Sequence, residues 1–285
     1  MRDNERAGAR PPTRESLEEY GRGVAGGLLF SLPLLYTMEM WQFGPSAHPL
    51  RLLIYVAATF VLLLGYNRFA GLRYDASWSE IVIDSVEEIG IGLVLSALVL
   101  TLLGRLDQTM TLSEVTGKVV LTAMTVAIGV SVGTSQLGGS TDGDSGSFEG
   151  AQESATPGIE QHLVLAFIGA VLIGGNIAPT EEVLLLGVEV PSVKLLGLIG
   201  ASLVLAAIIL FYSSFRNTER VAEGGLLLVM RRTVITYVVA LCAAALVLWF
   251  FDRFAGISLI HAVSQVVVLG GATTLGASAG KLLIK

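Results

Sequence analysis

The sequence predicts an all-α, polytopic helical membrane protein with about eight transmembrane helices in two four-helix repeats and a broken helix at Pro179. Three observations lead to this fold class. Hydrophobic residues make up 53% of the chain and charged residues only 15%, whereas soluble domains carry about 25% charged residues. The apolar residues form blocks of about 20, the length that crosses a bilayer as a helix. The two halves of the chain also resemble each other in several segments.

We expect each apolar block to form a helix, because a helix satisfies its own backbone polar groups inside a bilayer. The blocks predict spans at residues 24–43, 50–70, 81–104, 116–137, 162–188, 193–215, 232–251 and 259–283. Residues 1–22 mix both charge signs and contain no apolar core, which predicts a disordered tail. Thirteen of the 18 Lys and Arg residues then fall on the side of the N-terminus. The positive-inside rule therefore predicts that both termini are cytoplasmic.

Residues 138–160, between the fourth and fifth spans, are rich in Gly, Ser and acids and contain no Lys or Arg. This composition is typical of a linker. Asp142, Asp144 and Glu149 lie in it without the ligand pattern of an EF-hand, so a linker is favoured over a metal site. The formal net charge of −6 and the lack of basic patches predict no nucleic-acid partner. The sequence contains no motif that predicts a cofactor.

An internal repeat is indicated by a gapless match between residues 116–133 and residues 263–280. It predicts one four-helix repeat over residues 23–137 and a second over residues 161–285. Each repeat has an even number of spans, so both insert in the same orientation. We expect a pseudo-twofold axis along the membrane normal to relate them, as in some transporters.

The matched segments contain two pairs of glycines four residues apart, Gly129 with Gly133 and Gly276 with Gly280. This G-x-x-x-G spacing predicts close packing against another helix. The same residues, with a serine between them, fit the G-x-S-x-G pattern of a hydrolase nucleophile elbow. That elbow requires a strand-to-helix turn, whereas both segments lie inside apolar blocks, so helix packing is the favoured interpretation.

The fifth apolar block contains the stretch GGNIAPTEEVLLLG, residues 174–187. Gly174 and Gly175 weaken a helix, and Pro179 removes a backbone donor and clashes with the preceding turn. We therefore expect one half-helix to end near Gly175 and a second to begin with Pro179 in its first turn.

Two acids, Glu181 and Glu182, follow this expected break. They have two interpretations. Acids in a first helical turn are stabilised by the helix dipole, so the pair can be a simple helix start. A broken helix at membrane depth also exposes carbonyl and carboxylate oxygens that bind a cation or proton, together with Asn176. We favour the binding site, because a carboxylate pair in a low dielectric is costly for a cap alone.

The first apolar block repeats this arrangement, since Pro33 precedes Glu39 by six residues. Trp41 suggests that Glu39 lies at the membrane interface. If spans one and five are neighbours across the pseudo-axis, Glu39 faces the pair of Glu181 and Glu182. Both placements of Glu39 stay open.

A third set of acids, Asp84, Glu87 and Glu88, lies at the start of the third span with the i, i+3, i+4 spacing of one helix face. The aligned start of the seventh span carries Arg231 and Arg232. Ion pairs across the pseudo-axis are the favoured interpretation, ahead of a gate or proton path.

With these residues identified, the chain resembles a bacterial family of uncharacterised integral membrane proteins built on a domain of unknown function. The resemblance rests on AGGLLFSLPLLYTMEMW (25–41) and GNIAPTEE (175–182), and it extends from about residue 20 to the end. It implies a multi-span protein of the bacterial inner membrane. It implies no reaction.

The acids inside apolar blocks favour a cation transporter, or a proton-coupled transporter or channel-like permease. Glu181 and Glu182 are the expected ligands, with Glu39 and Asn176 assisting. Such oxygen ligands suit Ca²⁺, Mg²⁺, Mn²⁺ or a proton. The alternative is a non-transporting scaffold or stress-related partner protein whose acids are structural. We expect no enzyme, since no nucleophile with a base and no metal set is evident at membrane depth. The expected partners are the lipid bilayer and a small inorganic cation or proton.

Overall fold

The computed structural model describes residues 13–71, 76–137, 159–214 and 221–280. Over these residues the chain forms helices and no strands. The helices are α1 (Thr13–Leu35), α2 (Met38–Ser46), α3 (Pro49–Ala70), α4 (Trp78–Leu102), α5 (Leu112–Gln136), α6 (Ile159–Ile177), α7 (Glu181–Glu189), α8 (Ser192–Ser214), α9 (Val221–Phe250) and α10 (Leu259–Ala279).

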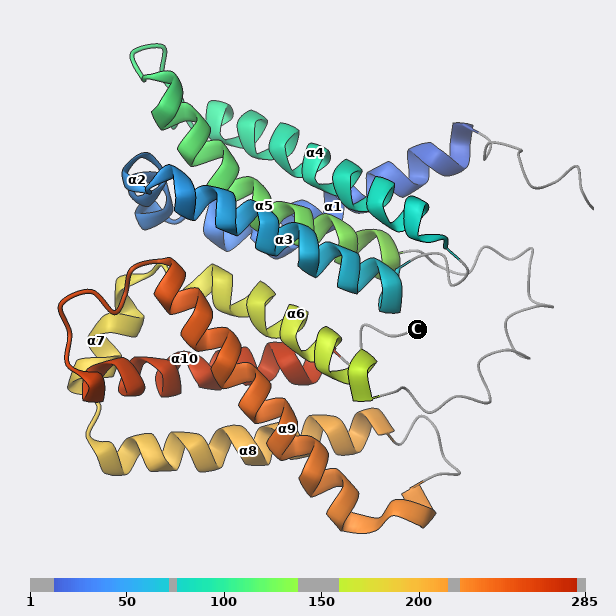
Figure 1. Ribbon diagram of the computed structural model, residues 1–285, viewed down its shortest axis with the longest axis vertical. Coiled ribbons are helices and arrows are strands. Elements are labelled where there is room, and N and C mark those ends of the chain that lie inside the picture. The colour runs from blue at the N-terminus through green and yellow to red at the C-terminus, as the bar shows by residue number, and fades with distance from the viewer. Residues whose placement is uncertain (1–12, 72–75, 138–158, 215–220, 281–285) are drawn as a thin grey trace, which may run out of the picture.

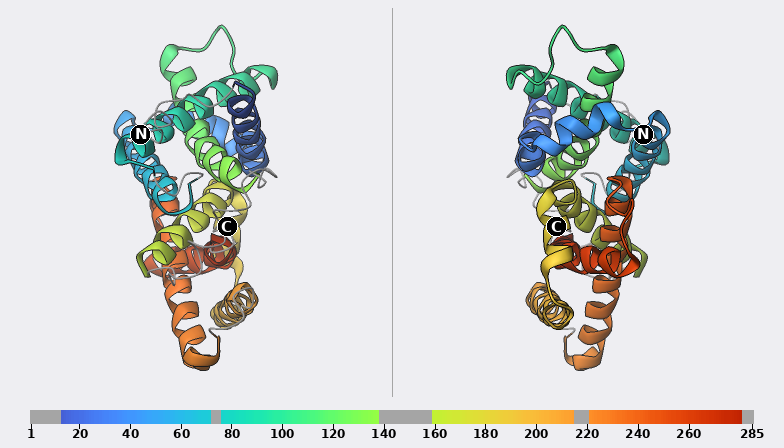
Figure 2. Two further views of the ribbon diagram at one scale, coloured as in Figure 1. Left: turned by 90° about the vertical axis from the view of Figure 1, so that its right-hand side faces the viewer. Right: turned by 90° about the vertical axis from the view of Figure 1, so that its left-hand side faces the viewer.

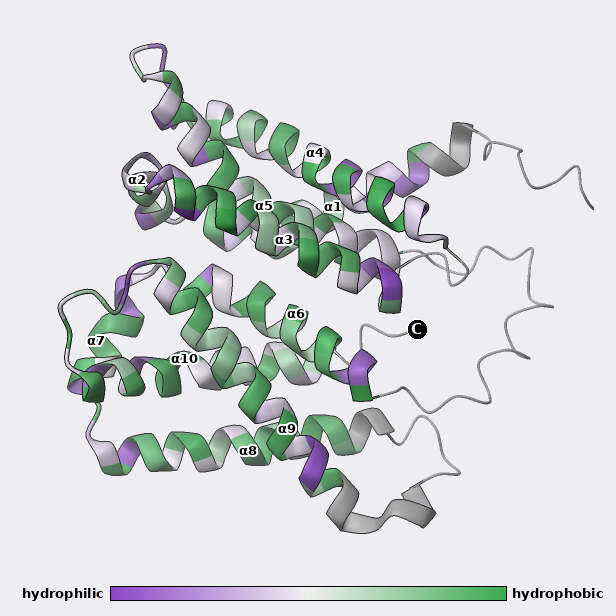
Figure 3. Cartoon of the chain, in the orientation of Figure 1, coloured by the Kyte–Doolittle hydropathy of each residue, from purple (hydrophilic) through white to green (hydrophobic). Residues whose placement is uncertain are grey.

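Eight of these helices are long and run back and forth across the molecule (Figure 1). Seven are long and apolar enough by themselves to cross a membrane, and α1 with α2 forms a further candidate span that is bent by 85°. Hydrophobic residues cover most of the length of the long helices, and hydrophilic residues gather towards their ends (Figure 3). These features confirm the predicted polytopic helical membrane fold.

The short helices α2 and α7 lie at the same end of the molecule, together with the loops 103–111 and 251–258 (Figure 1). We call this the turn end. At the opposite end, which we call the linker end, α1, α4 and α6 begin and α3 and α5 finish. The helices α1–α5 form one half of the molecule and α6–α10 the other, and the two halves are stacked along the long axis (Figure 2).

The two halves share one packing scheme. In the first half α5 is central and packs against α1, α2, α3 and α4; in the second half α10 packs against α6, α7, α8 and α9. The halves meet mainly where α6 contacts α1, α3 and α5. Leu165, Ile168 and Leu172 of α6 are buried there against side chains of α3 and α5.

Glycines bring the central helices close to their partners, in agreement with the G-x-x-x-G interpretation. A Cβ atom added to Gly26 of α1 would overlap Gly133 of α5, and one added to Gly129 would lie 3.1 Å from the carbonyl oxygen of Gly26. In the second half a Cβ atom on Gly169 of α6 would overlap Gly276 of α10. A Cβ atom on Gly280 would overlap the backbone of Leu165. Backbones this close gain strong van der Waals contact in a membrane.

The chain breaks after α6 near Pro179, as predicted, but the details of the break differ. Gly174 and Gly175 lie within α6, which continues to Ile177, so these glycines do not break the helix. Pro179 lies in the connection and precedes Thr180, the N-cap of α7, instead of occupying the first turn. The carbonyl of Gly174 still accepts a hydrogen bond from the amide of Ala178, which carries the helical path past the glycines.

The first half differs from expectation in two ways. Residues 13–22 were assigned to a disordered tail, but they are the start of α1. Pro33 lies inside α1, and the chain turns only at Tyr36 and Thr37, so Pro33 does not mark the break itself. The hydroxyl of Thr37 donates to the Pro33 carbonyl at 2.5 Å, which stabilises the end of α1.

We predict that Gly169→Val lowers the free energy of unfolding in detergent by at least about 3 kcal/mol, the upper end of the usual cost of overpacking. The reason is that the added side chain meets backbone atoms of α10, which cannot rotate away. Gly175→Ala on the same helix is the control, since a Cβ atom there meets nothing within 4 Å. A Gly169→Val variant as stable as Gly175→Ala would show that α6 and α10 are not in this contact.

Candidate functional site

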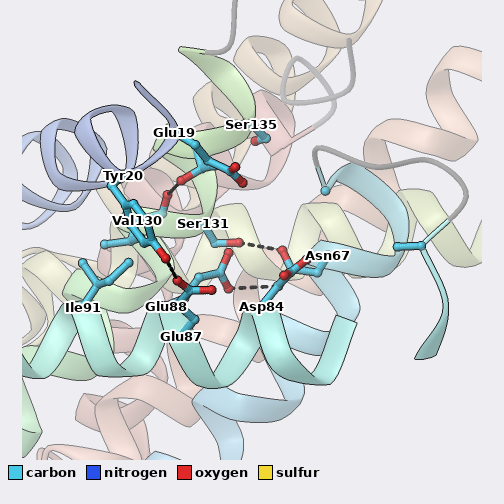
Figure 4. Close-up of a pocket in the computed structure, with 14 residues that line it drawn as sticks. Glu19, Tyr20, Asn67, Asp84, Glu87, Glu88, Ile91, Val130, Ser131 and Ser135 are labelled. Atoms are coloured by element: carbon cyan, nitrogen blue, oxygen red, sulfur yellow. Dashed lines mark hydrogen bonds between the residues drawn. The ribbon is translucent and has the colours of Figure 1, made fainter. Parts of the chain in front are cut away.

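A pocket lined by acids opens at the linker end of the first half. It has a volume of about 160 Å³ and lies among α1, α3, α4 and α5 (Figure 4). The side chains that line it and carry charge or hydrogen-bonding groups include Glu19, Tyr20, Asn67, Asp84, Glu87, Glu88, Ser131 and Ser135. The third set of acids identified in the sequence therefore lines one pocket, as its spacing along one helix face predicts.

The start of α4 places these acids. Ser77 is the N-cap, and its side chain and that of Glu80 form a capping box that fixes the first turn. Asp84, Glu87 and Glu88 follow in the next turns. Glu87 is exposed, Asp84 is partly buried, and Glu88 points inward with 9% of its surface exposed.

Asn67 holds Glu88 in place. Its amide nitrogen donates to a carboxylate oxygen of Glu88 at 2.9 Å and to the hydroxyl of Ser85 at 3.1 Å. Its amide oxygen accepts a hydrogen bond from Ser131 at 2.9 Å. The Ser85 hydroxyl in turn donates to the carbonyl of Ile81 at 2.7 Å. One side chain of α3 thus connects α4 and α5, and both ends of its amide group are satisfied.

The charges near Glu88 make this site unusual. Glu88 lies roughly 15 Å along α4 from its first residue, given a rise of about 1.5 Å per residue, and therefore inside the span. Its charged neighbours are Asp84 and Glu87, which carry the same sign, and in the described part of the chain no Lys or Arg pairs with it. An isolated carboxylate in an apolar setting is costly. A proton or a bound cation would remove that cost.

The rim of the pocket is formed by α1. The Tyr20 hydroxyl donates a hydrogen bond to the carboxylate of Glu87, and Glu19 lines the same cavity (Figure 4). Across residues 13–71, 76–137, 159–214 and 221–280, no three His, Cys, Asp or Glu side chains are grouped so that they could hold a metal ion. The arrangement therefore offers one buried carboxyl group with an acidic entrance, and not a preformed cage for a divalent cation.

The acids of the broken helix lie elsewhere. Glu181 and Glu182 are both exposed, in the first turn of α7 at the turn end. Backbone amide hydrogen bonding at the helix start and the Thr180 hydroxyl hold the pKa of Glu182 below its usual range. This is the helix-start interpretation of the pair, and the expected burial in a low dielectric is not observed. The role of these acids in ion binding stays a prediction.

Arg253 lies at the break between α6 and α7 and is influenced by the charges of Glu39 and Glu181. Its Nε atom donates to the carbonyl of Ala178, in the break between α6 and α7, at 3.2 Å. Burial lowers the pKa of Arg253, while the charges of Glu39 and Glu181 raise it. Glu39 is partly exposed in the first turn of α2, and whether it faces the pair of Glu181 and Glu182 stays a prediction. The sequence analysis did not assign a role to Arg253.

The side chain of Asn176 is hydrogen-bonded to backbone carbonyls of α1 and α6. Its amide nitrogen donates to the carbonyls of Leu172, at 2.7 Å, and of Phe30 on α1, at 3.1 Å. It therefore ties α6 to α1. Its amide oxygen is buried and has no hydrogen-bond partner among the residues that the structure describes.

Among the residues that the structure describes, no ion pair joins the acids of α4 to Arg231 or Arg232. The acids of α4 and the arginines of α9, Arg231 and Arg232, belong to helices on opposite sides of the molecule (Figure 1). Glu87 and Glu88 bond to Tyr20 and Asn67 instead. The reason is that α5 and α6 lie between the two helices, so that equivalent positions in the two halves do not meet.

Sequence reasoning missed the part played by Asn67. A polar amide in the apolar block 50–70 is itself a signal, because polar groups inside a span are costly unless they have a partner. Ser131 was noted only as the middle residue of a G-x-S-x-G pattern. Neither residue could be matched to Glu88 without knowing that α3, α4 and α5 are packed together.

We predict that Asn67→Leu lowers the free energy of unfolding in detergent by about 2–4 kcal/mol, because it leaves a buried carboxyl group and the Ser131 hydroxyl without their partner. The double variant Asn67→Leu, Glu88→Leu should lose less than the single variant, since no buried acid is then left unpaired. A loss in the double variant equal to the sum of the losses in Asn67→Leu and Glu88→Leu would mean that the two side chains do not interact.

The comparisons with known proteins agree with this architecture. Neither a curated protein nor a solved structure matches the chain. Residues 19–284 match the family described as putative integral membrane protein (DUF2391). This range includes every helix from α2 to α10 and most of α1. The chain belongs to this family of integral membrane proteins.

Proposed function

We propose that the chain is a multi-pass permease that moves a small cation, with the proton as the species that fits best, and that Glu88 is its binding group. The observation that carries the proposal is a carboxyl group 9% exposed inside a membrane span, without a cationic partner among the described residues and with two further acids beside it. Ionisable groups in this situation typically mark ion paths and proton relays.

The geometry favours a proton over a divalent cation. One carboxyl group with an amide donor on one oxygen suffices to exchange a proton, whereas Ca²⁺ or Mg²⁺ needs several converging oxygen ligands. Glu19, Asp84 and Glu87 give the entrance a negative potential, which attracts cations of either kind. Asn67 would orient the carboxyl group, and Ser131 would fix the orientation of Asn67.

We also propose how the molecule is oriented. Two internal repeats with both termini in the cytoplasm would account for the shared packing of the halves and for the distribution of Lys and Arg. The pocket of Glu88 would then open towards the cytoplasm, and the turn end would face outward. A bacterial inner membrane is the location that fits this orientation.

The site proposed here replaces the turn-end acids as the leading candidate. Glu181 and Glu182 are exposed and have the environment of a helix start, so they give no support to a binding cavity. An enzymatic role is not proposed.

We predict that purified protein in liposomes conducts protons down a pH gradient or a membrane potential, and that Glu88→Gln lowers this flux at least about tenfold, because a carboxamide cannot take up and release a proton. Glutamine keeps an oxygen that can accept the Asn67 hydrogen bond, so the variant should fold. The readout is a pH-sensitive dye inside the vesicles, with divalent and monovalent cations tested in parallel.

The matched control is Glu182→Gln, an exposed acid at the turn end, for which we expect unchanged flux. If Glu182→Gln loses flux and Glu88→Gln keeps it, the acids after the helix break become the candidate binding site again. If no ion moves faster than through empty vesicles, the proposal fails and the non-transporting scaffold becomes the better interpretation.

A further inference from the structure

The two halves are joined at the turn end by an ion pair. A guanidinium nitrogen of Arg51, in the first turn of α3, lies 2.8 Å from a carboxylate oxygen of Asp252, in the loop between α9 and α10. The two side chains are 34% and 51% exposed, so solvent reaches the pair. An ion pair of this kind is weak and reversible.

The backbone conformation at Asp252 is unusual for a residue with a side chain. Asp252 has φ of 61°, in the left-handed region where a residue with a side chain is strained. The corresponding turn of the first half ends α4 with the same pattern of backbone hydrogen bonds, from residues 103, 104 and 105, and has Gly104 at this place with φ of 65°. Glycine adopts this conformation without strain. Aspartate enters this region more readily than most residues with a side chain, and here its carboxylate also reaches Arg51.

Aromatic rings pack behind the ion pair. The rings of Tyr55 on α3 and Phe250 on α9 are stacked with centroids 4.3 Å apart, and Phe43 of α2 contacts Phe251 at 5.4 Å. Tyr55 and Phe43 belong to the first half, and the other two rings to the second. We call these four rings, with Arg51 and Asp252, the turn-end contact.

Helix α3 connects the turn-end contact to the Glu88 pocket. Arg51 and Tyr55 lie in its first two turns and Asn67 in its last. The two sites are thus at opposite ends of one straight helix, roughly 24 Å apart for 16 residues. Near its Asn67 end, α3 packs against α6 of the second half, where a Cβ atom on Gly65 would lie 3.0 Å from Val164. A rigid helix that reaches both sites can couple them if it has two arrangements whose equilibrium both sites bias.

We propose that α3 couples the turn-end contact to Glu88, so that the two halves separate at the turn end in one state of the Glu88 carboxyl group and close in the other. The inference rests on the proposed function. It adds to that function a contact at the turn end that opens and closes. When Glu88 gains or loses a proton, its hydrogen bond to Asn67 changes and α3 shifts. Coupling of this kind is reciprocal, so opening the contact also changes the proton affinity of Glu88.

The test measures the distance between spin labels on the two halves, in liposomes. Gln42→Cys on α2 and Ala255→Cys in the α9–α10 loop carry the labels, both at exposed positions, in a Cys242→Ala chain. Asp252→Gly breaks the ion pair and gives the turn the residue that the first half has. Arg51→Gln breaks the pair from the other side.

We expect a second, longer distance whose population rises about two- to fivefold in each of these variants, the change that loss of one exposed ion pair produces. Glu88→Gln, which imitates the protonated acid, should change the same population at alkaline pH, where the wild-type carboxyl group is ionised, whereas Glu189→Gln, an exposed acid outside the contact, should not. An unchanged distance in both ion-pair variants would overturn the proposal, and so would a change in them that Glu88→Gln does not reproduce. Distances that respond to all three variants support the coupling even if no proton flux is found, in which case only the proposed function fails.

Discussion

The fold depends on one constraint, that a backbone carbonyl in a bilayer needs a hydrogen-bond partner from the protein. A helix that stops leaves its last carbonyls free, and α1 and α6 are among the helices that stop at the turn end. The carbonyl of Leu35, the last residue of α1, accepts a hydrogen bond from the indole nitrogen of Trp41 at 2.9 Å. After α6, the carbonyl of Ala178 accepts from Arg253. The two halves meet the same requirement with different side chains, and these fix where α2 and α7 lie.

The segment GVSVG of α5 shows how packing and the site are built from the same residues. Gly129 and Gly133 are four residues apart and face α1, where they bring the backbones together. Ser131, midway between them, is on the opposite side of the helix and reaches Asn67 of α3. In α10 the glycines of GASAG pack against α6 in the same way, but Ser278 is buried with no partner among the described residues. The first half therefore has a completed polar site at this place, while its counterpart carries only the serine.

The sequence was sufficient to predict the spans, the break near Pro179 and the shared face of Asp84, Glu87 and Glu88, because each depends on local periodicity or on proline chemistry. The sequence was insufficient to predict how deep in the membrane the break lies. The 19 residues of α6 already cover about 28 Å, close to the thickness of the hydrocarbon core. A helix of this length can cross the core before it reaches the acids, and Glu181 and Glu182 are exposed in the structure. The partnership of Asn67 with Glu88 depends on which helices are neighbours, and no local pattern contains that information.

The free energies of the turn-end contact and of proton binding at Glu88 are of a size that suits a molecule with two states. The turn-end contact rests on an exposed ion pair, worth up to about 1 kcal/mol, and on ring contacts worth about 0.5–1.5 kcal/mol each. A difference of one unit in proton affinity between two states is worth about 1.4 kcal/mol. A ligand can shift an equilibrium only by its difference in affinity for the two states. A difference of one to three units in the proton affinity of Glu88, about 1.4–4 kcal/mol, is therefore of the same size as this contact.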